Sequence, residues 1–353
     1  MSHAAGAVIA APLPWRRGIV WLLFLGPFFF VSYGFANRLA AQRVVTDSLV
    51  FSWEQHIPFL PWTILPYWSI DLFYGLSFLC CRNRSAVDRH ALRLLTAQLI
   101  CVAAFLLFPL HFSFDRPSTD GVFGAMFDAL MGFDQPYNQA PSLHIALLVV
   151  IWVRFAEAVP SGWRPVAHAW AALIAISVLT TFQHHFFDMP TGAAVGMLCL
   201  WLWPDEGSPP LAALTAGASF RRYRLAACYA GAATMLTAVA FVLKGGALWL
   251  CWGALALAMI ALIYLGPGGA GFQKRDGRHS LPVTVLLAPY LAGAWLNSRW
   301  WTRHRPQADE IAAGVWLGRL PTADEMAAAR FAGILDLTAE LPGPRGAWRY
   351  EGL

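Results

Sequence analysis

Five polar residues of types suited to phosphate chemistry lie between residues 116 and 188, each beside a long apolar run. They are Arg116, Ser142, His144, His184 and Asp188. Polar groups are costly inside a membrane, and where they occur they mark a functional site by default. We therefore expect three helix ends to bring these five side chains together as one phosphate-handling site.

His184 and Asp188 are four residues apart, a spacing that stacks two side chains on one face of a helix. A carboxylate beside an imidazole fixes its tautomer and stabilises its protonated form. The pair is therefore suited to act as a nucleophile or as a general base. The alternative is a buried hydrogen bond that only closes a helix end.

Ser142 and His144 follow Pro141, which is unfavourable inside a helix but favourable just before one. Ser142 is a natural helix N-cap, and the amide groups of a helix start favour anions. His144, just inside this start, would face a bound anion, although an ordinary cap with an interfacial histidine is the alternative. Arg116 could hold a phosphate through two hydrogen bonds, or instead reach lipid headgroups from the loop.

The elements that must position these residues are membrane helices. Of the 353 residues, 58% are hydrophobic and 13% are charged, whereas about 25% are charged in soluble domains. Apolar runs of about 17 to 22 residues match the ~20 that cross a bilayer. The expected fold class is all-α, a polytopic transmembrane helical bundle of about eight or nine membrane segments with a short α/β-like soluble tail. The expected segments are 18–35, 62–81, 94–110, 142–159, 166–183, 185–203, 225–243, 247–265 and 281–296, with a basic loop at 82–93 and a long loop at 111–141. For 281–296, which is short and interrupted by proline, a full span and a partly re-entrant segment are both open.

The positive charge predicts the orientation of these segments. The formal net charge of +5 comes almost entirely from arginine, and in a membrane protein it does not by itself indicate nucleic acid. Most cationic residues fall in loops on the side of the N-terminus. The other side holds only Arg38, Arg43, Arg116 and Lys244 in this arrangement. The positive-inside rule then places the N-terminus in the cytoplasm and the polar clusters on the outer face.

The order and spacing of the clusters resemble the phosphatidic acid phosphatase type 2 (PAP2) superfamily. Its three motifs have the forms K-x6-R-P, P-S-G-H and S-R-x5-H-x3-D. The resemblance covers roughly residues 50–205. The matching positions here are Arg116-Pro117 for the end of the first motif, Pro141-Ser142-x-His144 for the second, and Ser177, His184 and Asp188 for the third.

Three positions depart from the superfamily pattern. Pro109, Leu143 and Val178 stand where the superfamily has Lys, Gly and Arg. Such a set resembles the inositolphosphotransferase-like branch, where P-S-L-H and Q-H-x-x-x-D forms occur. The stretches 57–62 and 66–71 are also similar to that branch.

The resemblance implies a six-helix core and a role for each residue. His184 would attack phosphorus and form a phosphohistidine, oriented by Asp188, and His144 would protonate the leaving oxygen. Arg116 and Ser142 would bind the phosphoryl oxygens. Covalent catalysis splits the transfer into two steps, and positioned donors meet the charge on the transferring group. No cofactor and no metal are expected.

The C-terminal residues have the composition of a soluble segment. Residues 311–321 predict a strand and turn, 323–331 a helix and 333–340 a strand. This order resembles the opening of a dual-specificity protein phosphatase domain, but no H-C-x5-R loop follows, so we expect a truncated segment without catalysis. The expected organisation is a PAP2-like membrane catalytic domain at 1–205, a basic linker at 206–224, additional transmembrane helices at 225–304, and an incomplete dual-specificity-phosphatase-like segment at 305–353.

The expected function is that of a membrane lipid-phosphate phosphatase at the outer face of a bacterial inner membrane. Its partners would be membrane lipids or lipid phosphates, and not nucleic acid. Two alternatives stay open. One is a phosphotransferase that moves a lipid headgroup, and the other is a non-catalytic lipid-binding or transport bundle that keeps its histidines as polar contacts between helices.

Overall fold

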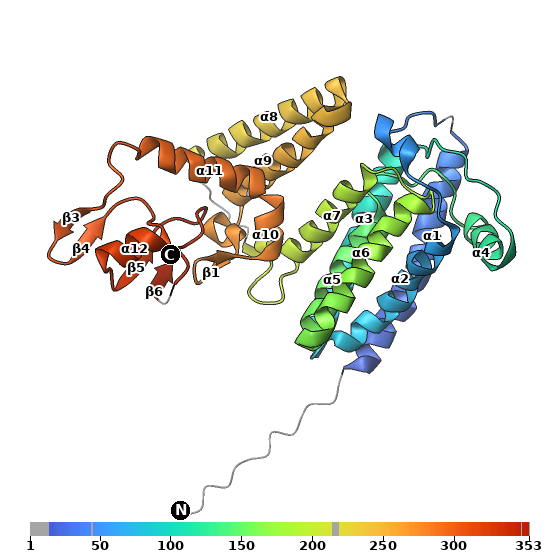
Figure 1. The fold of residues 1–353 in the computed structure, drawn as a ribbon, viewed down its shortest axis with the longest axis horizontal. Coiled ribbons are helices and arrows are strands. Elements are labelled where there is room, and N and C mark those ends of the chain that lie inside the picture. Colours follow the sequence, from blue (N-terminus) through green and yellow to red (C-terminus); the bar gives the residue numbers. More distant parts are fainter. Residues whose placement is uncertain (1–13, 44, 214–218, 347, 353) are drawn as a thin grey trace, which may run out of the picture. The chain divides into compact units, whose positions relative to one another are not determined.

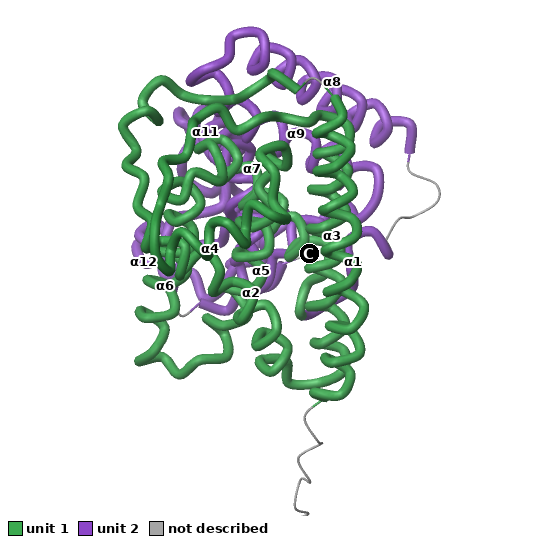
Figure 2. The backbone as a smooth tube through the Cα atoms, turned by 90° about the vertical axis from the view of Figure 1, so that its right-hand side faces the viewer, with its two compact units in different colours: residues 1–205 green, residues 206–353 purple. Residues whose placement is uncertain are grey.

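The computed structural model of the chain describes residues 14–43, 45–213, 219–346 and 348–352. The chain is mostly helical and folds as two compact units, Met1–Asp205 and Glu206–Leu353 (Figures 1 and 2). Residues 1–13 of the expected membrane domain and 214–218 of the expected linker lie outside the described residues. The functions expected for the four segments stay predictions.

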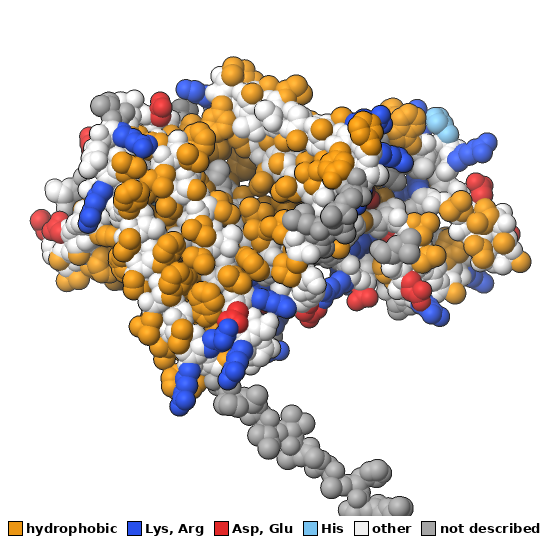
Figure 3. All heavy atoms as spheres, turned by 180° about the vertical axis from the view of Figure 1, so that it is seen from behind, with side chains coloured by type: hydrophobic (Ala, Val, Ile, Leu, Met, Phe, Trp, Pro, Cys, Tyr) orange, Lys and Arg blue, Asp and Glu red, His pale blue; other side chains and the backbone are white. Residues whose placement is uncertain are grey.

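Within the described ranges, five helical segments are long and apolar enough to cross a bilayer. The chain is therefore an integral membrane protein. In Figure 3, apolar side chains cover the visible face of the first unit, and Lys and Arg gather at the end where its first helix begins. The segments are Trp15–Ala41 (α1), Arg84–Leu107 (α3), Ser161–Thr180, which contains α6 (Arg164–Thr180), Phe220–Leu243 (α8), and Gly245–Leu265, which contains α9 (Leu250–Leu265).

Three shorter helices complete the bundle of the first unit: α2 (Ile64–Ser77), α5 (Leu143–Ala158) and α7 (Asp188–Leu202). Consecutive helices of the bundle alternate in direction, and α5 packs against both α6 and α7 while α2 packs against α6 (Figure 1). The starts of α2, α5 and α7 therefore meet the end of α6 at one end of the bundle, called the site end below. All the polar clusters singled out in the sequence lie there.

Two expected loops are partly helical. Residues 111–141 contain α4 (Gly121–Met131), an 11-residue helix that is too short to cross a bilayer. The 82–93 segment is not a loop either, since α3 begins at Arg84. Asn83 caps this helix by accepting a hydrogen bond from the backbone N–H of Ala86 at 2.8 Å. The arginines in the first turns of α3 made this stretch of sequence look like a basic loop, which explains the wrong prediction.

Two glycines one turn apart on α7 set the spacing between α5 and α7. A Cβ at Gly192 would overlap the carbonyl oxygen of Ser142, and one at Gly196 would lie 2.7 Å from that of Ala146. Small residues at this spacing let membrane helices approach closely. The contact brings the start of α5, which carries Ser142, against the start of α7.

Replacing Gly196 with leucine should force α5 and α7 apart. Overpacking of this kind costs about 1–3 kcal/mol, so we expect a lower melting temperature in detergent and lower activity. Gly26→Leu is the matched control, because a Cβ at Gly26 meets no atom within 4 Å. Equal melting temperatures for the two variants would contradict this account of the helix contact.

At the opposite end of the bundle, two buried arginines bind a partly exposed aspartate. Arg93 of α3 and Arg154 of α5 bind the Asp205 carboxylate at 3.0 and 2.6 Å, and Arg93 Nε donates to the carbonyl oxygen of Trp203 at 2.7 Å. Partial burial opposes the ionisation of Asp205, but the two guanidinium charges outweigh it and hold its pKa below the ordinary value. This cluster fixes the end of α7 against α3 and α5, and so the depth at which α7 starts.

The second unit joins the helices α8 and α9 to a small α/β segment. The expected ninth membrane segment is broken in two at Leu287. The strand, helix and strand predicted for the tail occur in that order, and Lys274 links the segment to a preceding hairpin by binding Asp336 at 2.6 Å. The elements after α9 are β1 (Lys274–Arg275), β2 (Arg278–His279), α10 (Leu281–Leu286), α11 (Ala288–Trp301), β3 (Asp309–Ala312), β4 (Val315–Leu317), α12 (Ala323–Ala329), β5 (Gly333–Asp336) and β6 (Arg349–Gly352), with β1–β2 and β3–β4 antiparallel and β5–β6 parallel.

Candidate active site

The turn between α6 and α7, residues 181–187, carries the expected nucleophile. Phe182 has a φ of 55°, a left-handed conformation that bulky residues rarely adopt and that costs about 1–3 kcal/mol. The backbone N–H groups of Gln183 and His184 both donate to the carbonyl oxygen of Val178 at 3.1 Å. Strained backbone of this kind clusters at functional sites.

His184 and Asp188 form the expected pair, although not on one helix face. His184 lies in the turn, and Asp188 is the first residue of α7. The Nδ1 of His184 lies 3.1 Å from Oδ2 of Asp188, and both side chains are buried. The carboxylate orients the ring through Nδ1, which leaves Nε2 as the nitrogen available for attack.

Ser142 and His144 lie directly beside this pair. Ser142 caps α5, its Oγ accepting from the backbone N–H of Ile145 at 3.3 Å, and its own N–H donates to the carbonyl oxygen of Asp188 at 3.1 Å. The His144 ring stacks on Tyr67 with centroids 4.2 Å apart. Its buried Nε2 has no hydrogen-bond partner in the described part of the chain.

Arg116 reaches the same end of the bundle and binds the turn itself. Its Nε donates to the carbonyl oxygen of Thr181 at 3.0 Å and its Nη2 to that of Phe182 at 2.9 Å. The guanidinium also lies over the ring of Phe127, 5.1 Å from the centroid. Arg116 is therefore positioned to hold the strained turn in place.

Replacing Arg116 with lysine keeps the charge but loses the planar fork that bonds two carbonyl oxygens. Because each hydrogen bond of a charged donor contributes about 1.5–3 kcal/mol, we expect turnover to fall by about tenfold or more. Arg38→Lys, at an exposed position in the last turn of α1, is the control. Wild-type turnover in Arg116→Lys would show that the charge alone suffices.

Glu54 is a site residue that sequence reasoning missed. It lies 1% exposed in a short 3-10 helix, Ser52–His56, before α2. Its Oε2 lies 3.0 Å from Nδ1 of His185 and accepts from the backbone N–H of Phe186 at 2.9 Å, while Oε1 accepts from that of Phe51 at 2.7 Å. Glu54 therefore fixes the backbone immediately after the expected nucleophile. Glu54 is the only carboxylate between residues 48 and 70 of the sequence. Such an isolated acidic residue in an apolar stretch could have identified it as a candidate site residue.

His185 is held from both sides and its tautomer is determined. Its Nε2 accepts from the backbone N–H of Ser113 at 3.0 Å, and a backbone N–H can only donate, so Nδ1 carries the proton toward Glu54. The ring also stacks on Phe112 with centroids 4.4 Å apart. The structure thus gives the two adjacent histidines different surroundings.

A second missed residue is Asp134, in the loop after α4. It accepts a hydrogen bond from the hydroxyl of Tyr33 at 2.7 Å, and its charge interacts with those of His184 and Arg116. Withdrawal from water raises the pKa of the Asp134 carboxyl, despite the opposing influence of these groups. Asn37 of α1 lies beside the Asp134 carboxyl group.

Amide side chains around Asp134 and the turn have buried atoms without partners among the described residues. Asn138 donates to the carbonyl oxygen of Tyr33 at 3.3 Å and Gln139 to that of Gln183 at 3.2 Å. Unpaired buried polar atoms are rare and call for water or a ligand. The unpaired atoms are both amide atoms of Asn37, Oδ1 of Asn138, Oε1 of Gln139 and Nε2 of Gln183.

The five residues expected from the sequence thus meet at one end of the first unit. Within the described ranges, no group of three or more His, Cys, Asp or Glu side chains is arranged to hold a metal ion. No protein-family model, no curated protein and no solved structure matches this chain. The function is therefore inferred from the residues of the site.

Proposed function

We propose that this protein is a PAP2-type lipid-phosphate phosphatase that works through a phosphohistidine intermediate. The observation that carries the proposal is the hydrogen bond from the Ser142 N–H to the Asp188 carbonyl oxygen, because it joins the start of α5, which carries His144, to the His184–Asp188 pair. The motif spacing relates residues along the chain, whereas this hydrogen bond joins two separate helix starts. A nucleophile with an orienting carboxylate and a second histidine nearby is the set that two-step phosphoryl transfer needs.

In the proposed reaction, Nε2 of His184 attacks phosphorus and the bond from phosphorus to the lipid oxygen breaks. His144 gives its proton to that oxygen, so the lipid leaves as an alcohol. Water then attacks the phosphohistidine while His144 takes up a proton, and inorganic phosphate is released. The hydroxyl hydrogen of Ser142 remains able to donate to a phosphoryl oxygen, because Oγ only accepts in its helix cap.

The proposal extends to the fold and its orientation. It assigns α1, α2, α3, α5, α6 and α7 to the six-helix core of the superfamily's inositolphosphotransferase-like branch. The arginines near the starts of α1 and α3 and the end of α5 lie at the end opposite the site, which supports a site on the outer face of a bacterial inner membrane. The C-terminal segment is taken to resemble the opening of a dual-specificity phosphatase domain, and the proposed reaction assigns it no role.

Transfer of a lipid headgroup is a second candidate, and the unpaired amides favour it. Neutral amides both donate and accept, as hydroxyl groups require, so Asn138, Gln139 and Gln183 suit an alcohol better than they suit a second anion. His184 would then hold the phosphoryl group with its headgroup while the lipid leaves as an alcohol, and an acceptor alcohol in place of water would attack phosphorus and break its bond to Nε2.

A substrate panel separates these candidates. Purified full-length protein in mixed micelles would be given phosphatidic acid, other phospholipids and isoprenoid phosphates. Phosphate release that is lost in His184→Ala and in His144→Ala is the expected result. Headgroup transfer without phosphate release would replace hydrolysis by the second candidate. Lipid binding without turnover of any lipid would favour the non-catalytic bundle.

A further inference from the structure

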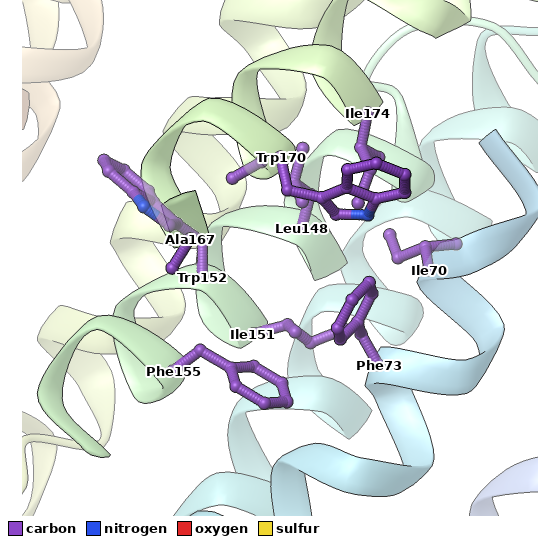
Figure 4. Close-up of a pocket in the computed structure, with 10 residues that line it drawn as sticks. Ile70, Phe73, Leu148, Ile151, Trp152, Phe155, Ala167, Trp170 and Ile174 are labelled. Atoms are coloured by element: carbon purple, nitrogen blue, oxygen red, sulfur yellow. The ribbon is translucent and has the colours of Figure 1, made fainter. Parts of the chain in front are cut away.

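A half-open apolar cavity of about 70 Å³ lies between α2, α5 and α6 (Figure 4). We call it the lateral groove. Its walls include Phe73 of α2, Leu148 and Phe155 of α5, and Trp170 and Ala171 of α6. The lining is almost wholly apolar, and the groove opens at the surface of the first unit. In a bilayer it therefore offers an occupant hydrocarbon contacts only.

The indole N–H groups of the two tryptophans in the walls are both hydrogen-bonded. The indole N–H of Trp170 donates to Oγ of Ser69 at 3.1 Å, and that of Trp152 bonds to Nδ1 of His168 at 2.8 Å. Both tryptophans therefore present apolar ring surface to the groove without an unmet donor. A polar headgroup finds nothing to bind there.

The groove begins directly below the candidate active site. Leu148 lies one turn after His144 on α5, and Ile70 lies one turn after Tyr67 on α2. The rings of His144 and Tyr67, which stack with centroids 4.2 Å apart, therefore lie about one turn above the groove. With 1.5 Å of rise per residue, the wall from Leu148 to Phe155 lies about 6 to 16 Å below His144. Half of the hydrocarbon core is about 15 Å thick.

We propose that the lateral groove binds a hydrocarbon chain of the lipid whose phosphate reaches His184. This inference rests on the proposed function and adds how the lipid is bound. The lipid enters laterally, from the membrane leaflet that lies on the same side as the candidate active site. The groove suits part of a single hydrocarbon chain, because its free volume of about 70 Å³ is too small for a further helix of about 10 Å across. The enzyme would accordingly prefer phosphates with long chains over short ones.

The test fills the groove at Ala171. The full-length Ala171→Phe variant is compared with Ala172→Phe, the same change one residue along α6 at an exposed position. The probes are alkyl phosphates of increasing chain length in detergent micelles. Because each buried methylene contributes about 0.8 kcal/mol, we expect Ala171→Phe to lose on the order of tenfold in kcat/KM for long chains. Turnover of the shortest chain should stay near wild type, as should all chains with Ala172→Phe.

A binding measurement keeps the groove testable apart from catalysis. Proteoliposomes would contain phosphatidic acid with a diazirine near the end of one acyl chain, and adducts would be mapped after irradiation. Adducts on the α5 segment 148–155 that disappear in Ala171→Phe but not in Ala172→Phe would support the groove proposal. This result would count even if the protein cleaves no lipid phosphate, since a lack of cleavage would defeat only the proposed function. Adducts spread evenly over the apolar helix surfaces, or identical chain-length profiles for the two variants of an active enzyme, would overturn the groove proposal.

Discussion

Replacing His184 with glutamine should lower phosphate release by about 10⁶-fold, the scale seen when a covalent nucleophile is removed from an enzyme. Glutamine keeps much of the volume and a group able to meet the buried Asp188 carboxylate, but it has no nucleophilic ring nitrogen. The loss should therefore appear in kcat, with little change in the melting temperature. His56→Gln is the control, because His56 is exposed in the 3-10 helix before α2.

Trapping the intermediate makes the same prediction chemically specific. Wild-type protein quenched in base after mixing with a ³²P-labelled lipid phosphate should carry label on residue 184. Asp188→Asn should keep the fold but present the imidazole in the wrong tautomer, which lowers turnover by up to about 10⁴-fold where it has been measured in another His–Asp pair. More than a tenth of wild-type activity in His184→Gln, or label on another residue, would exclude His184 as the nucleophile.

The elements of this fold were predictable to the extent that they span the membrane. Long apolar runs predict α1, α8 and α9, because a helix needs about 20 apolar residues to cross a bilayer. The same rule misses α4, which is 11 residues long, and places the start of α3 ten residues late. The first turns of α3 carry arginines whose charge is met by distant groups, as for Arg93 and Asp205, and a one-dimensional pattern does not contain that pairing.

The candidate site was likewise predictable only in part. Spacing suggested the pairing of His184 with Asp188, but the conformation that produces it is a strained turn and not a helix face. Contacts across long stretches of chain, such as Arg116 with Thr181 and Glu54 with His185, were not predictable because nothing local specifies them. The sequence marked the residues suited to chemistry, while the residues that hold them in place emerged only from tertiary contacts.

Glu54→Gln should lower both the stability of the fold and the rate of the reaction, although Glu54 does not contact the substrate in the proposed reaction. The buried carboxylate accepts from the backbone N–H groups of Phe51 and Phe186 and from His185. An amide group must turn its own N–H toward one of these donors, leaving it unpaired. Breaking a buried charged network costs about 3–5 kcal/mol, so we expect a clear fall in melting temperature. Because Phe186 lies two residues after His184, kcat should also fall by about tenfold or more.

The kinetic split decides whether Glu54 positions the nucleophile or only stabilises the fold. Measured well below the melting temperature of the variant, kcat should remain low while KM changes little, since the substrate contacts are intact. Asp47→Asn, at an exposed position in the same connector, should leave both kcat and melting temperature unchanged. Wild-type kcat in a destabilised Glu54→Gln protein would reduce Glu54 to a structural role. A low kcat in folded protein would establish that the 3-10 helix before α2 controls the turn that carries His184.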